Sequence, residues 1–217
     1  IWYVFTVRNN RQQAERLVRE YLQRPTGYLI QQMQEYHGPA VSELEKSRQS
    51  DKGPASECLR ATVALMSFEP SPELPAVILD HITAATRDDW RIITESLLKL
   101  DESGRQQLLD DLQKRTDAAE ADRALQLRFL LLTGLLGDWE PLNRICRADE
   151  DPTDRTAWIH DQKELVPIDP GLLAEMAFRD QTTAEPDTQS ALCLVLGDLG
   201  TDAMEVRDKL RQLLEAS

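Results

Sequence analysis

Hydrophobic residues between positions 11 and 24 recur at the spacing of an amphipathic helix. The apolar positions are Ala14, Leu17, Val18, Tyr21 and Leu22. Residues three and four positions apart share one face of an α-helix, and Pro25 prevents the helix from continuing. The pattern therefore predicts a helix that buries one face and ends before Pro25.

Similar patterns predict short helices along the rest of the chain, about twelve in all, joined by connections rich in Pro, Asp and Gly. The predicted ranges are 11–24, 28–36 with a continuation at 40–48, 56–68, 76–85, 90–100, 104–115, 123–136, 142–148, 156–164, 171–179, 187–199 and 204–215. Short connections favour neighbouring antiparallel helices. The expected fold class is therefore all-α.

Short sequence signals are predicted to set several helix ends. They are a break at 37–39, a first-turn proline at Pro75, capping by Asp88 and Asp89 ahead of Trp90, capping by Ser103 ahead of residue 104, and a C-cap at Gly137 with Asp138. The helix that ends at Gly137 is the most apolar in the chain, so we expect burial on nearly every side.

Three landmarks of the middle of the chain return later, at offsets of 66, 68 and 64 residues. The pairs are Pro75 with Pro141, Trp90 with Trp158, and Leu112 with Met176. Such a period equals two helix pairs of roughly 33 residues, the scale of HEAT- and armadillo-like arrays. We therefore expect an α-solenoid over residues 11–217, with units near 11–71, 72–140 and 141–217, whose helix pairs cover one another and leave no interior pocket.

The charge is strongly acidic and unevenly spread. The whole chain has 25 Lys and Arg against 38 Asp and Glu, a net charge of −13, whereas residues 1–24 carry five Arg against two Glu. An acidic body repels phosphate backbones, which argues against nucleic-acid binding. The simplest interpretation of the acidity is solubility.

Residues 1–7 are apolar and aromatic, and Arg8 and Arg11 follow at once. A membrane span needs about 20 apolar residues, but aromatic residues beside an arginine cluster are typical of a membrane interface. We predict that residues 1–10 are the end of a truncated transmembrane segment and its basic junction, with the cytoplasmic face favoured, and that the fragment itself is soluble. The alternative is an ordinary helix start that packs on the body.

The residue types that carry chemistry are scattered. The sequence has no hydrolase nucleophile elbow, no phosphate-binding glycine loop and no zinc-ligand spacing. The single histidines are His37, His81 and His160, and the single cysteines are Cys58, Cys146 and Cys193. Isolated residues of these kinds predict surface histidines and buried free thiols.

Acidic clusters also lack the pattern of a site. Residues 149–154 hold four carboxylates, but Pro152 and the missing glycine do not fit a calcium loop. The pairs Asp88/Asp89 and Asp110/Asp111 lack the aromatic-lined cleft of a glycosidase. We predict that Trp90 and Trp158 serve helix packing. The sequence therefore predicts no catalytic, cofactor-binding or metal-binding residue, and no cofactor.

Several segments resemble the helical middle region of planctomycete-type membrane-bound serine/threonine kinases. They are Ala14 to Leu22, Leu29 to Tyr36, Leu59 to Pro70, Arg123 to Arg128, and Thr156 to Arg179 with its Pro170. Proteins of that family join a kinase domain, a membrane span, a HEAT-like region and often a formylglycine-generating sulfatase-modifying domain. No kinase motif lies in this chain, so the resemblance carries no catalytic residue over to it.

The function expected is a non-enzymatic helical-repeat scaffold or protein-interaction module within a larger membrane-anchored, kinase-type signalling protein. Its partner would be another protein or a neighbouring domain of the same polypeptide. A lid that packs on the sulfatase-modifying domain is one form of this hypothesis. The alternative is an all-α ligand-binding or enzymatic domain with an acidic cleft, which would enclose one pocket with strongly perturbed carboxylates.

Overall fold

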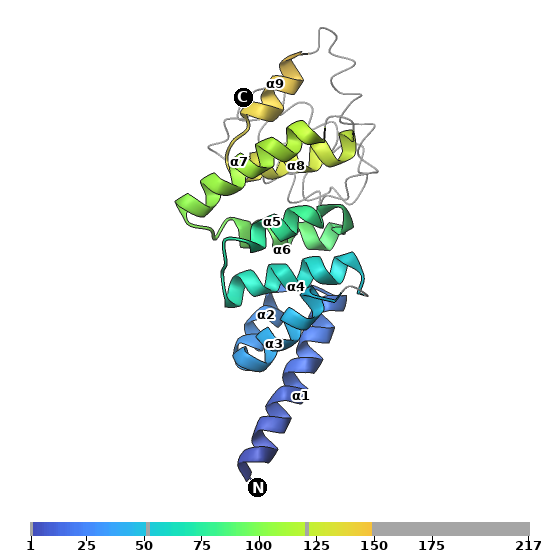
Figure 1. The fold of residues 1–217 in the computed structure, drawn as a ribbon, viewed down its shortest axis with the longest axis vertical. Coiled ribbons are helices and arrows are strands. Elements are labelled where there is room, and N and C mark those ends of the chain that lie inside the picture. Colours follow the sequence, from blue (N-terminus) through green and yellow to red (C-terminus); the bar gives the residue numbers. More distant parts are fainter. Residues whose placement is uncertain (1, 51–52, 120–121, 149–217) are drawn as a thin grey trace, which may run out of the picture. The chain divides into compact units, whose positions relative to one another are not determined.

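The computed structural model describes residues 2–50, 53–119 and 122–148, and every regular element in these ranges is helical (Figure 1). The α-helices are α1 (Trp2–Gln23), α2 (Gly27–Gln34), α3 (His37–Arg48), α4 (Ala55–Phe68), α5 (Leu74–Asp80), α6 (Arg87–Leu97), α7 (Glu102–Ala118), α8 (Arg123–Leu135) and α9 (Glu140–Ala148). A short 3₁₀ helix, η1 (Ile82–Ala84), follows α5. The all-α prediction is confirmed for this part of the chain.

The chain divides into two compact units, residues 1–104 and 105–217. The helices predicted from residue 156 onward, together with Trp158, His160 and Cys193, lie outside the described residues. The solenoid, its twelve helices and its three repeat units therefore stay predictions.

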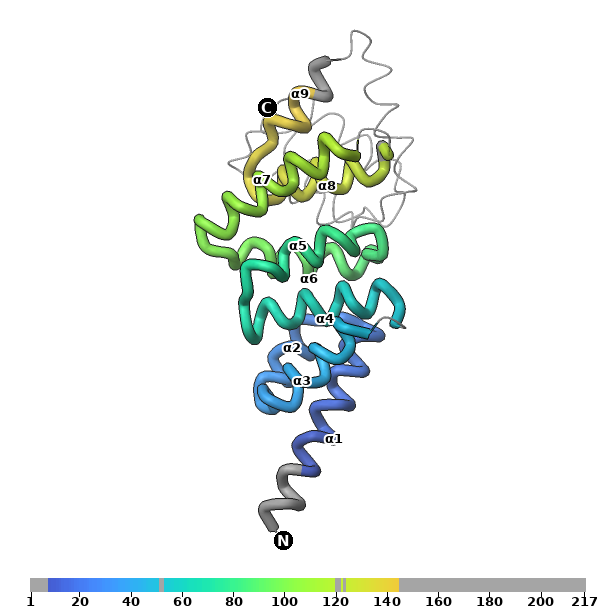
Figure 2. The backbone as a smooth tube through the Cα atoms, viewed as in Figure 1, coloured from blue at the N-terminus to red at the C-terminus, as the bar shows by residue number. Residues whose placement is uncertain are grey.

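Helix α4 is the centre of the first unit. It contacts the three helices that precede it, α1, α2 and α3, and the three elements that follow it, α5, η1 and α6. In Figure 2, α4 lies between α1 to α3 and the pair α5 and α6. Its wide buried surface explains this position. The buried residues of α4 are Leu59, Ala61, Thr62, Val63, Ala64 and Leu65.

Helix α1 packs by the face that its sequence pattern predicts. All five predicted apolar positions are buried, with Ala14 and Tyr21 fully inaccessible to solvent. The helix ends at Gln23, before Pro25, as expected. Residues 8–12 are exposed, so α1 packs on the rest of the unit through its C-terminal half, residues 14–22.

Two predicted helix limits that precede α6 are wrong. The segment 37–39 does not break a helix, because it forms the first turn of α3; Pro39 fits there since the first N–H groups of a helix have no intrahelical acceptor. The break lies at Glu35 and Tyr36 instead. The predicted helix over 76–85 ends at Asp80 and gives way to η1, although Pro75 does occupy the first turn of α5 as predicted.

The second unit contains α8, whose residues 127–134 are buried without interruption, as the sequence predicted. Gly137 ends this helix with a φ of 103°. Its N–H donates to the Gly134 carbonyl at 2.9 Å, and the Asp138 N–H donates to the Thr133 carbonyl at 3.1 Å. This pair of bonds is a Schellman motif, so the predicted C-cap is confirmed.

Helix α9 packs on α8. Trp139, the residue immediately before α9, is buried, and its ring lies against Gly134 of α8. A Cβ atom built on Gly134 would lie 2.7 Å from Cζ3 of that ring. The absence of a side chain at Gly134 is therefore what lets the indole lie against the backbone of α8.

Candidate functional site

The start of α6 holds the most deeply buried carboxylate that the structure describes. Asp89 is fully inaccessible, whereas its neighbour Asp88 is exposed. Thr86 is the N-cap residue and Asp89 the third residue of the helix, so the two form a capping box. Asp89 Oδ2 accepts hydrogen bonds from the Thr86 N–H at 2.8 Å and from its hydroxyl at 2.7 Å. The predicted capping by Asp88 and Asp89 is therefore corrected: Thr86 is the cap, and Asp89 supports it from inside the helix.

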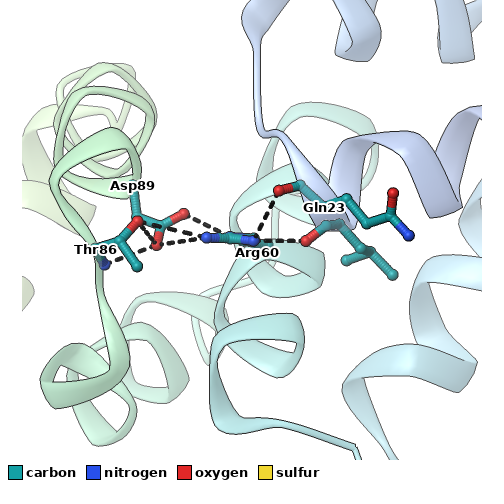
Figure 3. A network of polar contacts seen from close by, with 5 residues as sticks. Gln23, Arg60, Thr86 and Asp89 are labelled. Atoms are coloured by element: carbon teal, nitrogen blue, oxygen red, sulfur yellow. Dashed lines mark hydrogen bonds and ion pairs between the residues drawn. The ribbon is translucent and has the colours of Figure 1, made fainter.

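Arg60 of α4 joins this helix start to the end of α1 (Figure 3). Its Nε donates to Asp89 Oδ1 at 2.7 Å, and its Nη2 donates to Asp89 Oδ2 at 3.1 Å and to Thr86 Oγ1 at 3.4 Å. On the other side, Nη1 donates to the carbonyls of Leu22 at 2.6 Å and Gln23 at 3.4 Å. We call these five residues the Arg60–Asp89 network.

The network places each charge where the helix ends favour it. Leu22 and Gln23 supply the last carbonyls of α1, which carry the negative end of the helix dipole, and the Arg60 cation lies against them. Asp89 lies in the first turn of α6, where the positive end favours an anion. The Arg60 side chain is 12% exposed and that of Asp89 0%, so each charge depends on the other for compensation.

Two further polar groups are buried close in sequence to the network. The Tyr21 hydroxyl and the Trp90 indole N–H have no hydrogen-bond partner within the described residues. Burial raises the pKa of Tyr21 above its usual value; the negative charge of Asp89 adds to the rise and Arg60 opposes it. The prediction that Trp90 serves packing agrees with its complete burial.

A groove of about 360 Å³ lies between α1, α3 and α4. Its lining residues are Glu15, Val18, Arg19, Leu22, Gln23, Glu43, Ser47 and Glu57. The lining contains three glutamates and one arginine, so its own residues carry an excess of negative charge. We call it the α1–α3–α4 groove; Leu22 and Gln23 belong both to its wall and to the Arg60–Asp89 network.

Ion pairs at the rim of the groove are solvent-exposed and weak. Arg11 Nε pairs with Glu15 at 2.9 Å and its Nη2 lies 3.8 Å from Glu43, while Lys46 also pairs with Glu43. The Arg11 and Lys46 side chains are 62% and 56% exposed. Exposed pairs of this kind contribute about 0–1 kcal/mol each.

Of the single histidines and cysteines, the structure describes the side chains of His37, His81 and Cys58. His37 is exposed and lies edge-on to Phe68, with ring centroids 5.5 Å apart, while His81 is half-buried. The Cys58 thiol is half-buried and donates to the Arg48 carbonyl at 3.3 Å. Burial raises the pKa of that thiol, against the effects of Thr62 and Arg48. Among the described residues, no group of three or more His, Cys, Asp or Glu side chains is arranged to hold a metal ion.

The remaining paired carboxylates are engaged on their own helix. Asp110 accepts a hydrogen bond from Gln106 at 3.0 Å, and Asp111 pairs with Arg115 at 2.9 Å. Both are intrahelical contacts of α7 at a spacing of four residues, the usual arrangement of an exposed helix face. The acidic segment 149–154 lies outside the described residues.

The Arg60–Asp89 network is the feature that sequence reasoning missed. Arg60 was one arginine among many, because its partners lie 29 and 38 residues away along the chain. Thr86-Arg-Asp-Asp89 did carry a signal, since Thr followed three residues later by an acid is close to the capping-box pattern. That signal locates the start of α6 but not the arginine that binds it.

Comparisons with known proteins give no relative for this chain. No family model matches it, and neither a curated protein nor a solved structure does so. Within the described residues, no helix is both long enough and apolar enough to cross a bilayer. The resemblance to kinase middle regions and the membrane attachment stay predictions.

Proposed function

We propose that this chain is a non-enzymatic, helical-repeat interaction module. The observation that carries the proposal is the Arg60–Asp89 network. The hydrogen bonds of these two buried charged side chains go to the last carbonyls of α1 and to the first turn of α6. A catalytic carboxylate needs a lone pair free for a substrate, whereas Asp89 Oδ2 already accepts from Arg60 and twice from Thr86. The order of α1 to α3, α4, and α5 with α6 along the first unit supports the finer proposal of stacked HEAT-like layers.

The α1–α3–α4 groove is the surface on which we place the partner. Its acidic lining suits a basic side chain, and its Val18 and Leu22 atoms suit the aliphatic stem of Lys or Arg. The partner proposed is therefore a segment of another protein, or of a neighbouring domain of the same polypeptide, that inserts one Lys or Arg. Electrostatic complementarity of this kind mainly sets specificity and the rate of association.

Site-specific photo-crosslinking in the intact parent protein tests this. A benzoylphenylalanine at Ser47, inside the groove, should crosslink to one defined segment that carries Lys or Arg, and Glu57→Lys should abolish that product. The same probe at Tyr28, whose side chain is 66% exposed outside the groove, is the control. Equal products at Ser47 and Tyr28, or a Ser47 product that survives Glu57→Lys, would contradict the proposal.

The same groove supports the second candidate, an all-α domain that binds a small cationic ligand in an acidic cleft. A polyamine is the simplest probe of that chemistry. Saturable thermal stabilisation by spermidine that disappears in Glu57→Lys would favour the ligand-binding function. No saturable stabilisation, together with a Ser47 crosslink to a protein segment, would favour the interaction module.

The membrane-anchored parent is a separate part of the proposal. It is supported by the apolar residues 1–7, the arginines that follow, and the continuation of this segment into α1 as one helix. It implies that the segment preceding α1 carries the anchor, and the resemblance to kinase proteins implies a kinase domain in the same polypeptide. Flotation of the intact parent with liposomes, with and without the residues that precede α1, tests the anchor directly.

A further inference from the structure

The Arg60–Asp89 network joins two helix ends that are distant in sequence, the end of α1 and the start of α6. One guanidinium serves both ends: Nη1 binds the Leu22 and Gln23 carbonyls, while Nε and Nη2 bind Asp89. The planar fork of arginine allows this division of donors, which a lysine ammonium cannot reproduce. The order of one helix end is therefore tied to the order of the other.

The end of α1 is packed through its buried side chains, and its last carbonyls are bonded by Arg60. The chain leaves the helix through the buried Pro25, which has no N–H to donate. The Arg24 N–H continues the helical pattern to the Glu20 carbonyl at 2.9 Å, and the last two carbonyls of the helix, those of Leu22 and Gln23, accept from Arg60. Loss of the guanidinium would leave both carbonyls without this donor.

The start of α6 depends on the same cation from the opposite side. Asp89 is fully buried, and its charge is tolerated because Arg60 and the Thr86 cap compensate it. The Asp89 carboxylate thus bonds to the Thr86 cap and to Arg60 at once. Arg60 in turn bonds to the α1 carbonyls, so the two helix ends share one set of polar contacts.

We propose that the Arg60–Asp89 network is a conformational coupling device, through which the last turn of α1 and the first turn of α6 order and open together. Because Leu22 and Gln23 also line the α1–α3–α4 groove, a change in that groove is transmitted to α6. The coupling does not depend on the proposed function, since it concerns the unliganded chain. A failed test here leaves the interaction module untouched.

Amide hydrogen exchange of the complete chain, read by mass spectrometry, tests the coupling. The variant Thr86→Ala removes hydroxyl contacts at the α6 end only, and Thr86 is exposed, so the fold should persist. We expect exchange to accelerate about threefold or more in the peptide over residues 84–92 and also in the peptide over residues 19–26. A purely local cap would change the first peptide and leave the second as in the native chain.

Arg60→Lys is the second variant, because it keeps the charge but removes the fork. It should accelerate exchange in both peptides by about tenfold. Arg48→Lys is the matched control: it alters an arginine–glutamate pair that lies within one helix, Arg48 with Glu45 at 2.8 Å, and should leave both peptides unchanged. Because Arg60 bonds to both helix ends directly, Thr86→Ala is the deciding variant. Acceleration confined to the 84–92 peptide in Thr86→Ala would overturn the coupling, even if Arg60→Lys accelerates exchange in both peptides.

Discussion

The helix ends described in the two units are ordered by different means. In the first unit, the end of α1 and the start of α6 rely on Arg60, which belongs to a third helix and lies dozens of residues from its partners. In the second unit, the end of α8 relies on Gly137 and on backbone bonds that close within the same turn. The first arrangement uses buried charge and the second uses backbone geometry, so substitutions should affect the two regions differently.

Removal of the Arg60 cation should have the largest effect on stability. In Arg60→Met the Asp89 carboxylate stays buried without its counter-charge, and breaking a buried pair from one side costs about 3–5 kcal/mol. Urea denaturation followed by circular dichroism measures the loss. Asp89→Asn added to Arg60→Met should recover part of it, because the uncompensated charge is then gone.

The control for Arg60→Met is Arg48→Met, which deletes a half-buried pair between Arg48 and Glu45 within α3, where the two side chains are 22% and 35% exposed. Such a pair contributes about 0–1 kcal/mol. Equal losses in the two single variants would mean that burial of the Arg60–Asp89 pair does not matter, and would remove the contrast between the two regions.

A methyl group at Gly134 should have the next largest effect. The Cβ of Gly134→Ala would lie 2.7 Å from the Trp139 ring, and overpacking of this kind costs about 1–3 kcal/mol. Gly27→Ala is the control, because nothing lies within 4 Å of a Cβ at that position; it should be neutral or stabilising. A neutral Gly134→Ala would show that Trp139 moves aside freely, and that this corner of the second unit is loosely packed.

The residue that caps the start of α7 differs from the one predicted from the sequence. Ser103 was the predicted cap, but α7 begins at Glu102, and Asp101 Oδ1 accepts from the Gly104 N–H at 2.7 Å. Asp101→Ala should therefore cost about 1 kcal/mol, as loss of an N-cap does, whereas Ser103→Ala should cost almost nothing. Thermal unfolding of both variants checks this, and the reverse order would restore the original prediction.

These cases show why some features could be predicted from the sequence and others could not. The buried stripe of α1, the burial of α8 and the Gly137 C-cap follow from spacing or from a residue with special backbone freedom, and all three are confirmed. The caps of α6 and α7 were misplaced by two residues, because Asp, Ser and Thr all suit an N-cap and several stand side by side. Local chemistry thus located these helices better than it located their first residues.

The candidate site was harder to predict because it depends on tertiary structure. The α1–α3–α4 groove collects Glu15, Glu43 and Glu57 from three helices, and no spacing along the chain connects them. Arg60 binds partners on either side of it in sequence for the same reason. Such contacts follow from how helices pack, which a single sequence specifies only through the sum of its buried faces.

The smallest effect, and one of opposite sign, is expected at Tyr21. Its hydroxyl is buried with no hydrogen-bond partner within the described residues, so Tyr21→Phe should stabilise the first unit by a few tenths to about 1 kcal/mol at pH 7.

The raised pKa of Tyr21 also predicts how the stability of the native chain changes with pH. A group whose pKa is higher in the folded state stabilises the fold fully below its unfolded pKa, about 10 for tyrosine, and loses that contribution as the pH rises above it. The native chain should therefore lose more stability than Tyr21→Phe between pH 8 and pH 11, measured as urea midpoints at both values. Parallel pH profiles would mean that the Tyr21 hydroxyl reaches water, and that the region around Asp89 is more open than its burial indicates.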